Sequence, residues 1–246
     1  MSLPELVALT PGQLGEDDVA RALAVAGACL GVGLPGVLLR EPRLSDRAWL
    51  AFGRGLREAC DRSGAWLAVH DRAHLAAAVG ADAVHLGFRS LEPDQLERVF
   101  ASKSTSKPTY EAASPAIGVS CHAGDGPEVW RDADYLFFGP VRATPSKPEG
   151  DPGWRPATGF DALSAFTGEV RRPVFALGGM EPDDVAAARA AGAHGLAVLG
   201  GVLGHADPVG QTRAFVDALG TGRSGGDQGS QRKRTRHPRG SQKFLC

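Results

Sequence analysis

Short apolar runs alternate with alanine-rich amphipathic segments along most of this chain. The apolar runs lack the every-second-residue alternation of a half-exposed strand, which is typical of parallel strands covered on both faces. We expect eight strands, at 5–10, 36–41, 66–71, 83–87, 116–122, 135–139, 174–178 and 195–200. Helices are expected between them, near 16–30, 45–62, 72–79, 93–101, 126–131, 159–168, 181–191 and 207–219.

Eight strand–helix units in a chain of 246 residues fit a single α/β domain. A closed (β/α)8 TIM barrel suits this order better than an open doubly wound sheet, and we assign the barrel to residues 1–219. In such barrels the chemistry lies at the carboxyl ends of the strands. The polar residues expected there are Arg40, Glu41, His70, Asp71, Ser120 and His122.

The sixth strand runs directly into a polar loop. Within four residues this loop carries two hydroxyl groups and one cation, on Thr144, Ser146 and Lys147. Such a combination suits an anionic ligand. Taken alone, the segment has a second interpretation of equal weight, a solvated turn.

Two glycine pairs follow the seventh and eighth strands, at Gly178-Gly179 and Gly200-Gly201. In phosphate-handling barrels the loops at these places bind phosphate through backbone N–H groups, and glycine lets the amides come close to the anion. The alternative is that both pairs only form tight turns. We favour phosphate, and the expected phosphate-binding residues are Gly178, Gly179, Leu199 and Gly200.

Charge is distributed unevenly, although the formal net charge is only −1. The segment 220–246 holds seven Lys or Arg residues, one Asp and almost no apolar residue, so we expect a disordered basic tail. A weak polyanion-binding arm is the other interpretation. The near-neutral total gives no reason to expect nucleic acid as a partner.

We expect no membrane association and a cytoplasmic protein. No apolar run approaches the length of a membrane span, and the N-terminus lacks a basic region followed by an apolar one. The four cysteines are widely separated, with no metal-type spacing, and are expected to be reduced. Cys121, beside His122, is either a reactive thiol or, as we favour, a small strand residue.

In the order and spacing of these motifs, the chain resembles the thiamine phosphate synthase/TenI family over residues 5–218. The resemblance implies a phosphate-binding (β/α)8 barrel. The segments that carry it are 37–41, 70–76, 84–87, 117–122, 133–148, 173–180 and 192–198.

The synthase of this family joins a pyrimidine diphosphate to a thiazole phosphate and expels diphosphate with the help of Mg²⁺. Most residues that the family pattern supplies for the diphosphate and the metal are replaced here. Leu38 stands at a Gln, Pro42 at a Lys, His70 at an Asn, and Phe88-Arg89-Ser90 replaces an acidic stretch. Asp71 is the metal ligand that remains if the chain is a synthase, with Glu92 or Asp94 as substitutes. Otherwise we expect no metal and no cofactor.

The thiazole-phosphate half of the family pattern is retained. We therefore expect a TenI-like thiazole tautomerase that moves a proton on a thiazole phosphate, with His122 as the acid/base and His70 as a second histidine on the same rim. His85 is expected to be a packed residue of the barrel. The expected substrate-binding residues are Arg40, His70, Asp71, Ser120, Thr144, Ser146 and Lys147.

Two other functions stay open: thiamine phosphate synthase, and a non-catalytic binder of thiazole or thiamine phosphate with a regulatory role. Dependence on Mg²⁺ separates the synthase from the tautomerase. Binding without turnover would indicate the third. The sequence also leaves open a homo-oligomeric state and the roles of the basic tail and of the loop 102–115.

Overall fold

The computed structural model describes residues 2–87, 90, 115–144, 149–150 and 154–221. The helix expected near 93–101, the loop 102–115 except for its last residue, and the tail beyond Thr221 lie outside these residues. The same is true of Ser146 and Lys147, from the loop that we expect to bind an anion.

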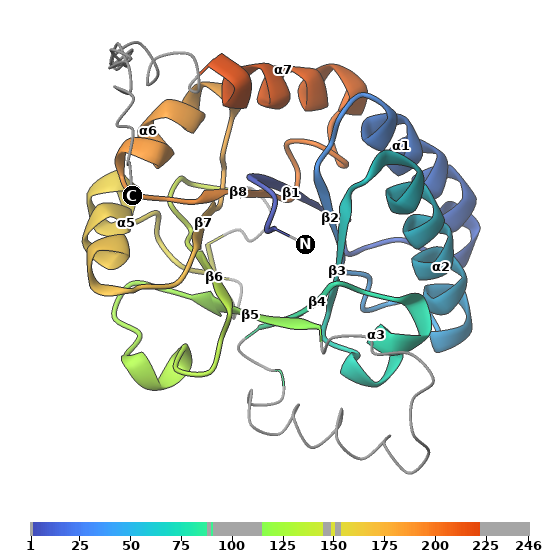
Figure 1. Cartoon of the computed structure of the whole chain (residues 1–246), viewed down its shortest axis with the longest axis horizontal. Helices are drawn as coiled ribbons and strands as arrows, with labels where there is room; N and C mark the ends of the chain where they lie inside the picture. Colours follow the sequence, from blue (N-terminus) through green and yellow to red (C-terminus); the bar gives the residue numbers. More distant parts are fainter. Residues whose placement is uncertain (1, 88–89, 91–114, 145–148, 151–153, 222–246) are drawn as a thin grey trace, which may run out of the picture.

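Eight parallel strands close into a barrel in which each strand pairs with the next and β8 pairs with β1, as the sequence predicted. Figure 1 looks along this barrel and shows the helices as an outer ring. The strands are β1 (Leu6–Leu9), β2 (Gly36–Leu39), β3 (Trp66–His70), β4 (Ala83–Leu86), β5 (Ala116–Cys121), β6 (Tyr135–Phe138), β7 (Val174–Leu177) and β8 (Gly195–Val198).

Six α-helices and three 3-10 turns are described around the strands, and none of these helices is long and apolar enough to cross a membrane. The helices are α1 (Val19–Gly31), α2 (Asp46–Ser63), α3 (Ala73–Val79), α5 (Gly159–Glu169), α6 (Val185–Ala190) and α7 (Pro208–Thr221). The turns are η1 (Glu16–Asp18), η2 (Pro127–Val129) and η3 (Pro182–Asp184).

The helix expected near 126–131 is only the turn η2, so this part of the helix prediction was wrong. The segment is short and carries Gly124 with a left-handed φ of 91°, Gly126 and Pro127. These residues favour a turn over a continued helix. The connection between β5 and β6 therefore carries a 3-10 turn in place of the expected α-helix.

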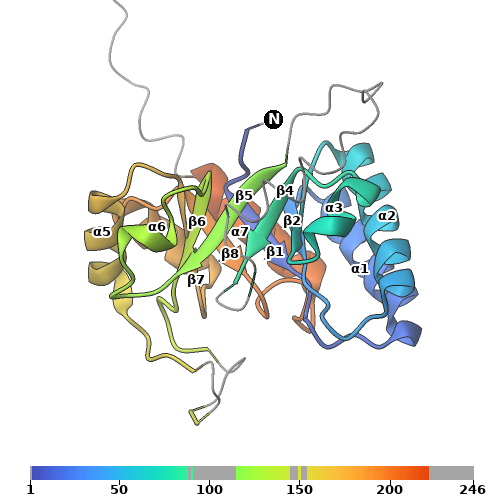
Figure 2. The ribbon, with the colours of Figure 1, turned by 90° about the horizontal axis from the view of Figure 1, so that it is seen from below.

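Successive side chains along the strands point alternately into the barrel interior and toward the layer under the helices. The interior is filled by an apolar cluster that includes Leu38, Trp66, Tyr135, Phe137 and Phe175, all at most 5% exposed. A second cluster lies between the strands and the helices. The interior is thus a packed core and not a pore, and it holds the strand ends in place. Figure 2 shows the strands from the side, with the N-terminus leaving the barrel at one end.

Candidate active site

The carboxyl end of β3 carries a closed group of three polar side chains. Asp71 Oδ2 lies 2.9 Å from His70 Nδ1, and Asp71 Oδ1 accepts a hydrogen bond from the hydroxyl of Ser90. Burial opposes ionisation of Asp71, but the hydrogen bond and charge of His70 and the bond from Ser90 outweigh it, so its pKa lies below the usual value. Both carboxylate oxygens are therefore already paired within the protein.

The backbone at this point is strained. Asp71 and Arg72 are consecutive non-glycine residues with left-handed φ values of 55° and 41°. Arg72 is held there by its side chain, which donates to Asp46 Oδ1 at 2.8 Å and to the carbonyl of Leu44 at 2.7 Å, and lies over the ring of Trp49. The start of α2 thus anchors the strand end that presents His70 and Asp71.

His85 lies inside the barrel, 1% exposed, with its ring centroid 4.0 Å from that of Phe137. The expectation of a packed barrel residue is confirmed, but it missed a polar contact: Nε2 lies 2.9 Å from the Ser120 hydroxyl oxygen. Burial, with a smaller contribution from His70, holds the pKa of His85 well below its usual range. His85 is therefore neutral at ordinary pH.

His122 follows the end of β5 and faces an acid. Its backbone N–H donates to Asp125 Oδ2 at 2.7 Å, and its ring Nδ1 lies 3.4 Å from the same oxygen. The preceding Cys121 is 1% exposed, and burial raises the pKa of its thiol to about 12. Of the two interpretations of Cys121, the structure favours the packed strand residue, because a nucleophilic cysteine needs an accessible thiolate.

Arg40 and Glu41, at the end of β2, have different roles. The Arg40 guanidinium lies against Gly12, where an added Cβ would overlap it. Glu41 is 2% exposed and accepts the backbone N–H groups of Gly12 and Leu14 at 2.8 and 2.9 Å. Glu41 therefore shapes the loop after β1, whereas Arg40 is half-buried at the rim, at a position suited to an anion.

The expected phosphate segments lie side by side at the ends of β6 to β8. A Cβ on Gly178 would approach Pro140 Cα to 2.7 Å, and one on Gly179 would overlap the carbonyl oxygen of Ala143. Both glycines also have left-handed φ values, 100° and 59°. Close packing on the loop after β6 thus accounts for this pair, as the turn interpretation held, and phosphate binding there stays a prediction.

Gly200 is different, because a Cβ there would meet nothing within 4 Å and the residue is exposed. Packing does not require a glycine at this position. Leu199, beside it, packs its side chain against the interior cluster. Thr144 is half-buried near the end of the described part of the loop after β6.

A divalent metal does not fit the described residues. They contain no group of three or more His, Cys, Asp or Glu side chains placed to hold a metal ion. Asp71, the one expected ligand among them, has both oxygens paired, and a hard cation such as Mg²⁺ needs several oxygen ligands. Glu92 and Asp94, the expected substitutes, lie outside the described part of the chain.

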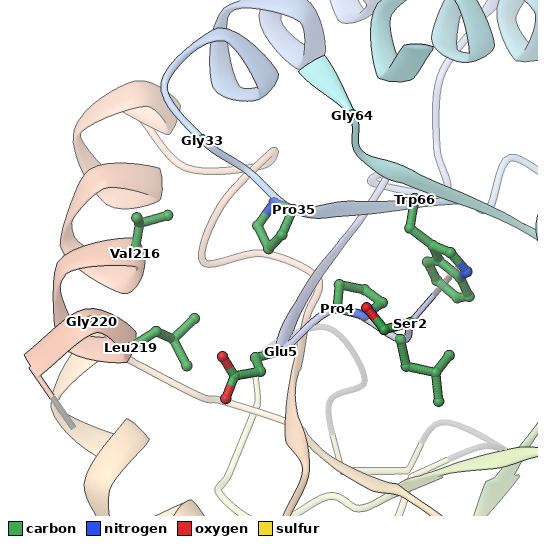
Figure 3. Close-up of a pocket in the computed structure, with 11 residues that line it drawn as sticks. Ser2, Pro4, Glu5, Gly33, Pro35, Gly64, Trp66, Val216, Leu219 and Gly220 are labelled. Atoms are coloured by element: carbon green, nitrogen blue, oxygen red, sulfur yellow. The ribbon is translucent and has the colours of Figure 1, made fainter. Parts of the chain in front are cut away.

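A hollow of about 470 Å³ lies at the opposite end of the barrel, where the strands begin (Figure 3). Pro4, Pro35, Trp66 and Leu219 line it together with Glu5. Glu5 is paired with Arg189 at 3.1 Å. Because conserved chemistry in these barrels lies at the other end, we do not assign the hollow to the active site.

The fold and the polar rim define a closed (β/α)8 barrel with histidine, carboxylate and hydroxyl groups gathered at the carboxyl ends of β3 to β5. The family model described as "Thiamine monophosphate synthase" matches residues 6–202. The chain therefore belongs to the thiamine monophosphate synthase/TenI family, as its motifs predicted.

Alignments with three curated relatives cover most of this chain and most of each relative. A thiamine-phosphate synthase of Thermobifida fusca is 36% identical over 203 residues, which is 81% of this chain and 84% of the relative. One of Salinispora arenicola is 34% identical and matches over 89% of this chain and 98% of its own. A protein of Geobacter sulfurreducens, named as a candidate thiamine-phosphate synthase, is 38% identical over 80% of this chain and 86% of its own.

Solved structures agree on the fold. Thiamine phosphate pyrophosphorylase from Pyrococcus furiosus superposes with a TM-score of 0.72 over 88% of this chain and 96% of that one, at 23% identity. A structure titled "Native KDPGal structure" reaches a TM-score of 0.64 at 17% identity. At such identities the likeness establishes the barrel and nothing further.

Proposed function

We propose that this chain is a thiamine-phosphate synthase, which couples a pyrimidine diphosphate to a thiazole phosphate. The observation that carries the proposal is the similarity of 34–36% to relatives with that name over at least four fifths of their length. These comparisons favour the synthase alternative over the tautomerase that the motifs alone put first.

In this proposal the thiazole phosphate binds across the rim formed by the ends of β5 to β8. The backbone N–H groups around Gly178, Gly179 and Gly200 hold the phosphate, and Lys147 adds a cation from the preceding loop. Ser120 and His122 then face the heterocycle. Arg40 and His70 supply positive or donor groups on the opposite side of the mouth for the diphosphate.

The family resemblance implies Mg²⁺ for this reaction. Asp71 is paired on both oxygens with His70 and Ser90, so no step of the proposal uses a metal at Asp71. The same pairing favours a second candidate function, the thiazole tautomerase. A proton shift requires no metal, and His122 with Asp125 beside it is a suitable acid/base group.

Two assays on the purified full chain separate these functions. The first measures thiamine phosphate formed from the two synthase substrates, with Mg²⁺ and with a chelator. The second follows the absorbance change of the non-aromatic thiazole carboxylate phosphate as it becomes aromatic. Product in the first assay supports the synthase, and Asp71→Asn shows whether that carboxylate takes part.

Conversion in the second assay alone, unaffected by the chelator, would replace the synthase with the tautomerase. Tight binding of thiazole phosphate with no turnover in either assay would reject both enzymes in favour of the binding protein. Lys147→Ala serves as a common control in each case, since it should weaken binding of the phosphate with little effect on kcat.

A further inference from the structure

The two ring nitrogens of His85 have different surroundings within the barrel. Nε2 lies 2.9 Å from Ser120 Oγ, whereas Nδ1 is buried and, among the described residues, has no hydrogen-bond partner. His85 is 1% exposed, and the rings of Phe137, Tyr135 and His70 lie around it at centroid distances of 4.0, 5.6 and 6.1 Å. A neutral imidazole carries its proton on only one of these nitrogens.

The choice between the two tautomers follows from which atom stays unpaired. With the proton on Nδ1, a buried N–H donor has no acceptor, which folded proteins rarely tolerate. With the proton on Nε2, the bond to Ser120 is made and only a lone pair on Nδ1 is left over. Buried acceptors without a partner are less rare than buried donors.

We propose that His85 is a positioning residue for Ser120, donating its Nε2–H to Ser120 Oγ so that the serine hydroxyl proton is directed into the mouth of the barrel. Ser120 is half-exposed near the carboxyl end of β5, whereas His85 is enclosed. The hydroxyl therefore donates to an acceptor atom of the bound ligand, an anionic oxygen or a heterocyclic nitrogen.

If His85 did not donate to it, the Ser120 hydroxyl could donate its own proton to the histidine ring, or rotate between solvent and ligand. The fixed tautomer removes the first of these choices. A core residue that touches no ligand thus decides whether Ser120 acts as donor or acceptor toward it. That ligand is the thiazole phosphate if the proposed function holds, and this part of the inference rests on it.

The tautomer can be measured without any ligand. A long-range proton–nitrogen NMR spectrum of the full chain labelled with ¹⁵N-histidine reports which nitrogen of each ring is protonated, and His85→Gln assigns the signal. We expect a protonated Nε2 and a bare Nδ1 from about pH 5.5 to 8, the range in which an ordinary histidine titrates. In Ser120→Ala the Nε2–H proton signal should shift, while that of His194 stays unchanged.

A binding experiment tests the consequence for the ligand. Calorimetry with thiazole phosphate compares the wild type with Ser120→Ala, His85→Leu, the double variant and His85→Gln. We expect each of the first two changes to weaken binding about tenfold, as loss of one hydrogen bond to a charged group does, and the double variant to be no weaker. His85→Gln should retain part of the affinity, because its amide can still donate to Ser120.

A proton on Nδ1, or a ring that titrates in the measured range, would overturn the proposal. So would a folded His85→Leu variant with wild-type affinity. If the wild type does not bind thiazole phosphate at all, the proposed function fails, and the tautomer spectrum still decides the role of His85.

Discussion

Arg142, on the loop after β6, donates from Nε to the buried carboxylate of Asp184 at a distance of 2.8 Å. Asp184 ends the turn η3 and is 4% exposed, and its other oxygen accepts the backbone N–H of Glu181 at 3.1 Å. The Arg142 guanidinium also lies over the ring of Phe160. This contact ties the loop that carries Thr144 to the segment that follows Gly178-Gly179.

Removing the Asp184 carboxylate should therefore affect both stability and phosphate binding. We expect Asp184→Ala to lower the free energy of unfolding by about 1–2 kcal/mol, the usual cost of a lost helix cap. The KM for the phosphate-bearing substrate should rise, because the two loops lose their link. Denaturant titration and steady-state kinetics measure these effects.

The exposed neighbour Asp183 is the matched control. Asp183→Ala should change stability by less than about 0.5 kcal/mol and leave KM unchanged. Equal effects of the two substitutions would show that the Arg142–Asp184 contact does not hold the loops.

Gly118 makes room for an aromatic ring inside the barrel. A Cβ on Gly118 would overlap the ring of Tyr135, which is fully buried. Gly118→Ala should lower the free energy of unfolding by about 1–3 kcal/mol through overpacking. Gly27→Ala in α1, where a Cβ meets nothing within 4 Å, should instead stabilise by about 0.5–1 kcal/mol. Thermal unfolding of both variants would test the contrast, and a Gly118→Ala variant as stable as wild type would contradict it.

The barrel was predictable from sequence because each of its strands is a short apolar run between helical segments. The same apolar runs do not indicate which side chains meet inside the barrel. A run that is apolar on both faces gives no alternation, so the sequence does not say that His85 faces inward and Val84 outward. The bond between His85 and Ser120 also joins residues 35 positions apart, which no local pattern indicates.

The pairing of Asp71 was hidden for a related reason. In the sequence Ser90 indicates only a lost carboxylate of the metal site, whereas in the structure its hydroxyl donates to Asp71. The sequence gives no sign of the left-handed backbone at Asp71 and Arg72, because neither residue is a glycine. This backbone depends on contacts of Arg72 with the start of α2. Local sequence identified the residues of the rim, whereas tertiary contacts decide their partners.

Stability should depend on pH through His85. Burial depresses the pKa of His85 in the folded state, while in the unfolded chain a histidine has a pKa of about 6.5. Below that value the unfolded chain takes up a proton that the folded protein does not. Folding stability should therefore fall as the pH decreases below about 6.5, by up to about 1.4 kcal/mol per pH unit for this one group.

Denaturant titrations of the wild type and His85→Gln at about pH 5 and pH 7 measure this dependence. His85→Gln should lose part of the slope that the wild type shows, while the exposed His205→Gln should retain it. The carboxylate of Asp71 acts on His85 in the opposite direction to burial, so Asp71→Asn in the same series separates its contribution. Identical slopes for wild type and His85→Gln would mean that His85 does not remain neutral when folded.

The pair formed by His122 and Asp125 predicts how catalysis responds to a change of one atom. Asp125→Asn keeps an oxygen that can accept the backbone N–H of His122, so the turn should persist, but it removes the negative charge 3.4 Å from Nδ1. If His122 exchanges protons with substrate, His122→Gln should lower kcat by about 10²- to 10⁴-fold, with KM nearly unchanged. Asp125→Asn should lower kcat by less, because the base remains and only its orientation and charge stabilisation are weakened.

The control is Asp132→Asn, which changes an exposed carboxylate in the same connection between β5 and β6. The variants are compared in the synthase assay or in the tautomerase assay, depending on which reaction the wild type catalyses. Wild-type kcat in His122→Gln would remove His122 from the chemistry, and Asp125 would then only shape the turn.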